Sequence, residues 1–336
     1  MHTTSLKAIF ALLSFSFLLT ACHKDKDMNE PTKPKQLAYG LGTSFGSTTG
    51  PGNDLFVPDA AAGIIYRIDT KTGDKTPFAG GFPKLIPEVG IGGIMDVVFL
   101  GGKAYALVSL VDDPTFPTGQ VNGIYRIDGP NSFKVIADLG AFNIAHQPTG
   151  FFIDVVTGVS YSIDTYRGGF LVNDGHLNRV LHVTLDGEIT VIHQFTNIVP
   201  TGLAVKDNII FISQAGPVPH DPSQGKVLAL SNSKFSTVTE VAAGAPLLVD
   251  VEFGRGQSLF ALSQGAYSGR VEGSPALPNT GSLVSVNADG TFTKVADKLN
   301  IPTSLEIIGN TAYIVTYGGE VWTIDNITGP PYGQPH

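Results

Sequence analysis

The stretch DVVFLGGKAYALV, residues 96–108, contains two apolar runs joined by a pair of glycines. Residues 96–100 and 104–108 have the length and the Val, Phe and Tyr content of β-strands. Gly101 and Gly102 can take the positive φ that a tight hairpin turn requires. The stretch therefore predicts a β-hairpin, and its nearly continuous apolar character predicts burial on both faces.

The same pattern recurs about every fifty residues. A small or acidic residue followed by apolar residues starts each copy, at steps of 54, 54, 52, 48 and 54 residues. These six segments, called strand A, are residues 42–45, 96–99, 150–153, 202–205, 250–253 and 304–307. A turn and two further strands, B and C, follow in every copy, and a fourth, D, follows in most. In the third copy, strand B is expected over residues 159–163, followed by a long B–C connection over 165–178. Six such repeats predict an all-β, six-bladed β-propeller of four-stranded antiparallel blades. A two-sheet sandwich, the alternative, does not explain the near-equal steps.

The sixth copy has no clear strand D, because residues 325–331 are rich in turn formers. A blade of three strands would leave an exposed sheet edge. We expect residues 36–39, just upstream of the first strand A, to supply the missing strand and close the ring. The predicted propeller then covers residues 36–329, followed by a C-terminal tail over 330–336.

The N-terminal segment is typical of an export signal. Residues 1–21 contain an apolar run that is too short to cross a bilayer, and Cys22, the only cysteine, follows two small residues. This ending resembles the lipobox of bacterial lipoproteins, which implies a signal peptide over 1–21 and a lipid on the sulfur of Cys22. An ordinary signal peptide is the alternative. Residues 22–35 are polar and contain proline, which predicts a disordered tether.

The lysines and aspartates after Cys22 resemble the export signal of surface lipoproteins of the Bacteroidetes type; a solvated spacer is the alternative. The resemblance implies an outer-membrane lipoprotein of the cell envelope, periplasmic or surface-exposed. The chain has 21 Lys and Arg against 29 Asp and Glu, and no basic run, which argues against a nucleic-acid partner. We expect a monomeric propeller held at the membrane by its lipid, with an envelope protein or a glycan as partner.

Loop lengths predict which end of the ring carries the binding site. In an up-and-down blade, the B–C and D–A connections emerge on the same side, and most of the long connections are of these two kinds. We expect a ligand, glycan or partner protein to bind this face, with solvated loops as the alternative. The polar residues predicted there are His146, Tyr166, Arg167, Asn173, Asp174, His176, His220, Asp221, Tyr267 and Arg270.

Asp96 and Asp250 start strand A in the second and fifth copies, on opposite sides of a six-membered ring. Two carboxylates near the central mouth could hold Ca²⁺ together with neutral oxygen ligands. The interpretation that we favour is that each carboxylate accepts backbone N–H groups at the head of its strand. No catalytic residue can be assigned; the G-x-S-x-G match at residues 42–46 lies inside a predicted strand, where a nucleophile elbow cannot form.

The blade motifs also resemble a known family. Segments 96–108, 147–150, 178–183 and 199–205 are similar in kind and order to the ScyD/ScyE family, related to NHL-type propellers, over about residues 40–325. That resemblance implies an exported six-bladed propeller of unsettled biochemical role. A weaker resemblance is to gluconolactonase-like propellers, which hold a divalent metal at the central mouth, but their Glu and Asn ligands have no clear counterparts here.

Three hypotheses of function follow. The first is a lipid-anchored propeller that binds a ligand, glycan or partner through its long-loop face. The second is a metal-dependent hydrolase or lactonase with Asp96 and Asp250 as ligands and His146 as general base. The third is a structural module of an envelope complex with no small-molecule site.

Overall fold

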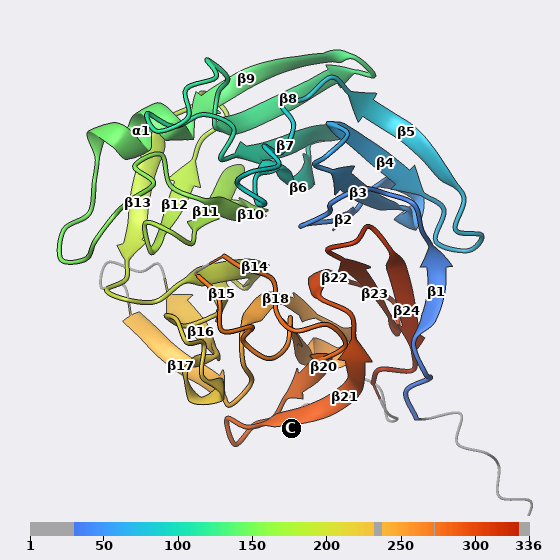
Figure 1. The fold of residues 1–336 in the computed structure, drawn as a ribbon. Coiled ribbons are helices and arrows are strands. Elements are labelled where there is room, and N and C mark those ends of the chain that lie inside the picture. The colour runs from blue at the N-terminus through green and yellow to red at the C-terminus, as the bar shows by residue number, and fades with distance from the viewer. Residues whose placement is uncertain (1–29, 232–236, 272, 329–336) are drawn as a thin grey trace, which may run out of the picture.

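Six blades surround a central axis in the computed structural model, which describes residues 30–231, 237–271 and 273–328 (Figure 1). Each blade is a sheet of four antiparallel strands, which confirms the predicted fold. The innermost strands are β2 (Thr48–Thr49), β6 (Gly93–Leu100), β10 (Ser160–Tyr166), β14 (Pro200–Lys206), β18 (Leu248–Phe253) and β22 (Pro302–Ile308). The second strands are β3 (Leu55–Asp59), β7 (Lys103–Ser109), β11 (Gly169–Asp174), β15 (Ile209–Gln214), β19 (Leu259–Ser263) and β23 (Thr311–Thr316).

The third strands are β4 (Ile64–Ile68), β8 (Gly123–Gly129), β12 (Arg179–Val183), β16 (Lys226–Ser231), β20 (Gly281–Val286) and β24 (Val321–Asp325). The outer strands are β5 (Lys75–Gly80), β9 (Ser132–Asp138), β13 (Ile189–Gln194), β17 (Thr237–Ala243), β21 (Phe292–Leu299) and β1 (Lys35–Ala38). The other elements are α1 (Leu139–Ala145) and the short 3₁₀ turns η1 (Pro51–Asn53), η2 (Pro222–Gln224) and η3 (Arg255–Gln257). Within the described residues, no helix is long and apolar enough to span a membrane.

The ring closes as expected, because β1 from the N-terminal end pairs with β24 from the last blade. Gln36 lies opposite Trp322 in this ladder. Pairing extends further upstream than predicted: the Thr32 amide donates to the Asp325 carbonyl at 2.9 Å. The C-terminal part of the predicted tether, residues 32–35, is therefore attached to the sixth blade; residues 22–29, with Cys22, lie outside the described residues.

Two predicted inner strands were wrong. In the third blade, residues 150–153 lie in a loop, and the Phe152 side chain is 85% exposed. The segment predicted as the second strand of that blade is its innermost strand, β10, and β11 occupies residues predicted as a loop. In the first blade the innermost strand is β2, a few residues after the predicted 42–45. In both blades, apolar residues of a loop lie at the repeat spacing. A short run of apolar residues looks the same in a loop as in a buried strand, so the sequence pattern does not distinguish the two.

The long connections gather on one face of the ring. These are the D–A connections 81–92 and 139–159 and the B–C connections 110–122, 215–225 and 264–280. We call this side the loop face, and the side of the A–B and C–D turns the turn face. The B–C connection of the third blade, predicted to be long, spans only residues 175–178.

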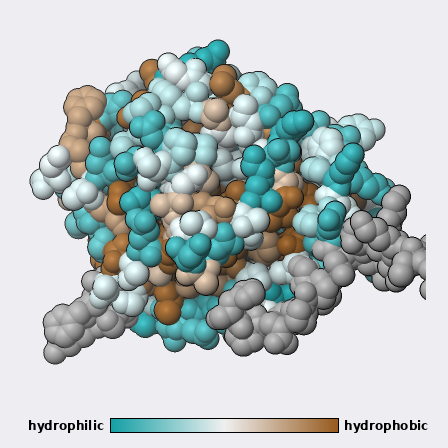
Figure 2. Space-filling view, turned by 90° about the horizontal axis from the view of Figure 1, so that it is seen from below, coloured by the Kyte–Doolittle hydropathy of each residue, from teal (hydrophilic) through white to brown (hydrophobic). Residues whose placement is uncertain are grey.

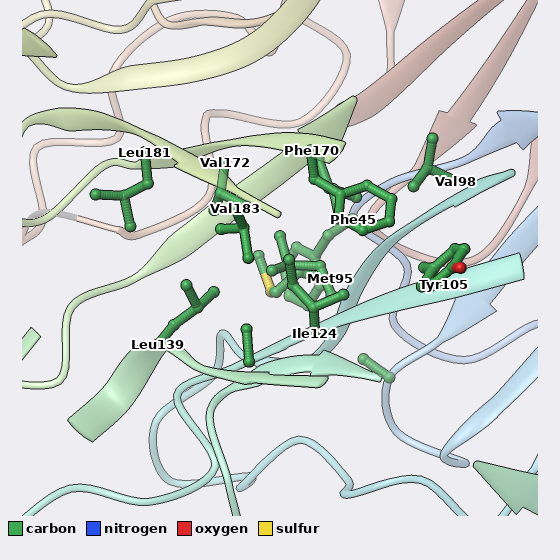
Figure 3. Packing of buried hydrophobic residues seen from close by; sticks show 14 residues of the cluster. Phe45, Met95, Val98, Tyr105, Ile124, Leu139, Phe170, Val172, Leu181 and Val183 are labelled. Atoms are coloured by element: carbon green, nitrogen blue, oxygen red, sulfur yellow. The ribbon is translucent and has the colours of Figure 1, made fainter. Parts of the chain in front are cut away.

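The hydrophobic core lies between neighbouring blades. Figure 3 shows the cluster between the second and third blades, where Met95 and Val98 of β6 face Phe170 and Val172 of β11. These side chains are at most 6% exposed. On the outer wall of the ring, seen in Figure 2, hydrophobic residues lie in small groups among hydrophilic ones. The molecule is therefore stabilised by packing between blades, as expected of a chain whose single cysteine can form no internal disulfide.

Deleting residues 33–40 removes β1 and exposes the edge of β24. We expect the loss of this ladder and of the buried Ala38 to cost about 3–5 kcal/mol. At roughly 2 °C per kcal/mol for a domain of this size, the melting temperature should fall by about 6–10 °C. Differential scanning calorimetry would measure it, with deletion of residues 24–29 as the control. A 33–40 deletion that melts with the parent protein would contradict this role of β1.

Candidate functional site

One cavity of the loop face lies over the centre of the ring and has a volume of about 300 Å³. All six blades contribute residues or loops to it, among them Val89, Leu110, Val155, His220, Leu247 and Tyr317. Because D–A and B–C connections converge at this end of the axis, residues far apart in the sequence meet there. We call it the loop-face cavity.

The floor of the loop-face cavity is apolar. Phe45, Tyr161 and Val249 line both this cavity and a second one further along the axis, so they lie between the two. The Phe45 ring packs edge-on against Tyr317, with ring centroids 5.8 Å apart. The Tyr317 hydroxyl donates to the Gly90 carbonyl at 3.1 Å, which ties this floor to the 81–92 loop. Such a floor favours an apolar ligand group and offers no charged group to it.

Few polar side chains line the same cavity. Nδ1 of His220 lies 3.2 Å from the Ala215 carbonyl oxygen. Because a carbonyl oxygen only accepts, Nδ1 carries the proton in this contact, and Nε2 is the acceptor of that tautomer. Gln264 receives the Ala276 amide on its side-chain oxygen at 2.9 Å, which leaves its NH₂ group as a donor. Both residues line the cavity, so it presents an acceptor and a donor above an apolar floor.

His176 forms the side of the cavity nearest the third blade. Its Nε2 lies 2.9 Å from Oδ1 of Asp154, and the His176 side chain is only 17% exposed. The backbone amide of His176 donates to Asp174 Oδ1 at 3.2 Å. His176 is therefore held from two sides: the 139–159 loop contacts its ring, and Asp174 at the end of β11 accepts its backbone amide.

A buried polar network holds the 139–159 loop to the third blade. Asp174 accepts from the Asn143 side chain at 2.7 Å and from the Leu177 amide at 2.9 Å. Arg179, 1% exposed, donates to the Asn143 side-chain oxygen at 2.7 Å and to the His146 carbonyl at 2.6 Å. Asp174 was predicted as a ligand-binding residue, but its oxygens are occupied by protein donors. Its role here is to position the loop that carries Asp154.

The other predicted binding residues are not all on one face. Tyr166 and Arg167 precede the A–B turn of the third blade, so they lie on the turn face, opposite the predicted side. The error follows from the wrong strand order in that blade. His146 is on the loop face but exposed, stacked on Phe142 with ring centroids 4.2 Å apart.

Two more predicted residues lie in the 264–280 loop. The Tyr267 hydroxyl donates to the carbonyl of Arg270, and the Tyr267 ring packs edge-on against His220 at 5.5 Å. Tyr267 therefore packs against a residue of the cavity wall without lining the cavity itself. Of the predicted binding residues, only His176 and His220 line the loop-face cavity. Sequence analysis missed its apolar floor, since Phe45, Tyr161 and Val249 look like ordinary core residues.

The second axial cavity, about 260 Å³, extends toward the turn face and is acidic. It is called the channel cavity here. Five carboxyl groups from four inner strands line it: Asp96, Asp164, Asp250, Glu252 and Glu306. Sequence analysis found only Asp96 and Asp250. The other acids lie in the inner strands, about two residues after the position at the head of each strand. Because alternate residues of a strand point to the same face, they share a face with the strand-head residues.

Asp96 and Asp250 each bridge two blades through backbone amides. Asp96 accepts from its neighbour Val97 at 2.8 Å and from Ile163 of the third blade at 3.0 Å. Asp250 accepts from Val251 at 2.9 Å and from Leu305 of the sixth blade at 2.7 Å. These contacts match the structural interpretation favoured for both residues. A Ca²⁺ ion would have to compete with these amides for the carboxylate oxygens.

Burial dominates the ionisation of the channel carboxyls. It raises the pKa of Asp164 to about 6 and that of Asp250 to about 7. The pKa of Glu306 rises to about 8, through burial and repulsion from Asp250, against the hydrogen bonds from Thr49. Burial followed by the charge of Glu306 also raises the pKa of Glu252. Within the described residues, no group of three His, Cys, Asp or Glu side chains is arranged to hold a metal ion.

Comparisons with known proteins identify the fold. No family model and no curated protein sequence matches the chain. Among solved structures, a gluconolactonase of Xanthomonas campestris is 12% identical with a TM-score of 0.59, over 87% of this chain and 89% of its own. A putative gluconolactonase is 12% identical, with a TM-score of 0.56 over 88% and 93%. A PQQ-bound aldose sugar dehydrogenase of Streptomyces coelicolor is 15% identical, with a TM-score of 0.57 over 88% and 98%. At these identities the likeness establishes a six-bladed propeller and no activity.

Because the pKa values of the channel carboxyls are higher in the folded protein than in the unfolded chain, protons are taken up on folding. The folded state therefore binds more protons than the unfolded state between about pH 4 and pH 8, and stability should fall as the pH rises through this range. We expect the melting temperature to drop by roughly 5 °C or more between pH 5 and pH 8.5. Glu306→Gln should melt higher than the parent at pH 8.5, and the exposed Glu88→Gln should not. Parallel pH profiles for parent and Glu306→Gln would refute this account.

Removing the Asp174 carboxylate should loosen the 139–159 loop. Asp174→Ala removes one of the two acceptors of the Asn143 side-chain amide and leaves several backbone amides without this acceptor, at an expected cost of about 3 kcal/mol. Urea unfolding would measure this loss. Asp186→Ala, an exposed turn residue of the same blade, is the control and should change stability by less than about 0.5 kcal/mol. Equal urea midpoints for the two variants would show that the network does not hold the loop.

Proposed function

We propose that this protein is an exported, lipid-anchored propeller that binds a small, largely apolar molecule in its loop-face cavity. The observation that carries this proposal is the cavity itself, of about 300 Å³, with an apolar floor and a few polar groups on its sides. Ligand sites are typically concave, mostly apolar and supplied with a small number of placed donors and acceptors. His220, Gln264 and His176 would orient the ligand, and the rigid ring holds them in place.

The path of β1 supports an orientation with the loop face turned away from the membrane. As an outer strand, β1 runs from the turn face to the loop face, so Lys35 lies at the turn face. A lipid on Cys22 would thus be joined to the ring from the turn face. Cys22 is 13 residues from Lys35, at most about 45 Å of extended chain. The cavity would then open toward the solvent or a partner.

The hydrolase hypothesis has less support from the geometry. Its proposed ligands, Asp96 and Asp250, belong to the channel cavity and are engaged by backbone amides, and His146 is exposed on α1 outside both axial cavities. The apolar floor of Phe45, Tyr161 and Val249 separates the loop-face cavity from the carboxyl groups below. The gluconolactonase neighbours are compatible with such an activity, but they share only the fold. Binding without catalysis is therefore the function that we favour.

A neutral, apolar fluorophore tests the binding proposal. N-phenyl-1-naphthylamine should become fluorescent on binding the signal-free protein, with one site per chain. Val89→Glu places a carboxylate in the cavity wall and should weaken binding at least tenfold, because an apolar site cannot solvate the charge. Leu185→Glu makes the same kind of change at an exposed position of the turn face and should leave binding unchanged. No saturable fluorescence, or equal loss in both variants, would overturn the proposal.

The lipid anchor has its own test. In a bacterial host that makes lipoproteins, the full chain should incorporate radiolabelled palmitate and sediment with membranes. Cys22→Ala should abolish the label and release the protein from the membrane fraction. Label retained by Cys22→Ala would exclude Cys22 as the attachment site.

A further inference from the structure

A third cavity opens on the loop face beside the third blade, with a volume of about 450 Å³. Its walls come from the 139–159 loop, from the B–C connection 175–178 and from the segment after β13. We call it the side cavity. It shares His176 with the loop-face cavity, so the two adjoin at that ring.

The side cavity differs in chemistry from the loop-face cavity. Hydroxyl and amide side chains line much of it, from Thr149, Asn178, Thr196 and Asn197. The Asn178 side chain donates to the Thr196 carbonyl at 3.0 Å, which fixes its amide plane. Thr149 and Asn197 are exposed, so their polar groups are accessible from solvent. These groups both donate and accept hydrogen bonds and carry no charge.

Phe152 adds an aromatic surface to the same cavity. Its side chain is 85% exposed, the most exposed large hydrophobic residue described, and Phe151 lies next to it. An exposed aromatic ring beside hydroxyl and amide groups fits a polyhydroxylated ring, whose C–H face packs on the aromatic ring while its hydroxyls exchange hydrogen bonds with the rim. A purely apolar ligand would leave the amides without partners, which is costly.

The charges around the two cavities further restrict the kind of ligand that can bind. Among the described residues, neither the side cavity nor the loop-face cavity is lined by Lys or Arg, and Asp154 is the one charged carboxylate between them. A phosphate or carboxylate head group would find no counter-charge there and would be repelled by Asp154. The ligand head should therefore be neutral.

From these observations we propose that the two cavities bind one neutral glycolipid-like amphiphile. Its apolar body lies in the loop-face cavity, and its sugar head packs on Phe152 in the side cavity, with His176 at the junction. This inference rests on the proposed function for the apolar part and adds the identity of the head group. His176 is held by Asp154 and Asp174, so the junction is preorganised for such a ligand.

Insertion of Phe152 into the bilayer that holds the anchor is the competing explanation for its exposure. The described chain enters the ring at the turn face, on the side opposite Phe152. The hydroxyl and amide groups around Phe152 would also lose their water in a hydrocarbon layer, at a cost of a few kcal/mol for each unpaired group. A soluble amphiphile therefore fits the site better than a lipid surface.

Displacement of bound N-phenyl-1-naphthylamine compares two probes that share an octyl chain. n-Octyl β-D-glucopyranoside carries a sugar head, and n-octyl tetraethylene glycol ether carries a neutral, flexible head without a ring. Both are used below their micelle concentrations. The glucoside should displace the fluorophore about tenfold more effectively from the parent protein. Phe152→Ala and Asn197→Ala should reduce this ratio to about one and leave fluorophore affinity unchanged.

Controls separate the two proposals. Ile144→Ala, a half-exposed apolar residue of α1 outside the cavities, should keep the tenfold ratio. Equal displacement by both probes from the parent, or an unchanged ratio in both side-cavity variants, would overturn the sugar site while the apolar site stands. Failure of the fluorophore itself to bind would overturn the apolar site first. A third outcome would support the membrane explanation and overturn the amphiphile proposal. In it, the parent protein binds neutral phosphatidylcholine vesicles, the Phe152→Ala variant does not, and neither probe is preferred.

Discussion

The structure depends on how the inner strands of neighbouring blades are joined, since in the described part of the chain no ladder of backbone hydrogen bonds runs between blades. Each inner strand is the edge of its own sheet, and its outward amides need acceptors. Carboxylates supply several of them: Asp96 bonds Ile163, Asp250 bonds Leu305, and Glu306 bonds Thr49 at 3.0 Å. Between the blades, apolar clusters such as that around Met95 and Phe170 exclude water.

The same constraint explains the ionisation of the channel. Carboxylates that reach across to a neighbouring blade must lie near the axis, where they are buried and close to one another. Their raised pKa values are the electrostatic consequence of this position. Here the same carboxylates join the inner strands of adjacent blades through these hydrogen bonds. At least three acids of the channel, Asp96, Asp250 and Glu306, thus have a structural role, because each accepts a backbone amide of a neighbouring blade.

On the loop face, the ring supplies the floor of the cavity and the long loops supply its walls. The ring holds Phe45, Tyr161 and Val249 as a floor, and the long connections build the walls. The 139–159 excursion is fixed by the buried contacts of Asn143, Asp174 and Arg179, so His176 and the side cavity are formed before any ligand arrives. Preformed walls reduce the entropy lost on binding.

Much of the architecture could be read from the chain. Six copies of an apolar strand pair at near-equal spacing specify six blades, because each sheet must bury both faces against its neighbours. The missing last strand specified closure by residues near 36–39, and loop lengths specified the face on which the long connections gather. The strands of the third blade were predicted wrongly because Phe151 and Phe152 lie at the repeat spacing but belong to a loop.

Only tertiary structure decides that Phe45, Tyr161 and Val249 meet at the axis, or that Asp164, Glu252 and Glu306 share a cavity. These residues lie between about fifty and two hundred positions apart in the sequence, and local periodicity carries no information about which side chains meet across a closed ring.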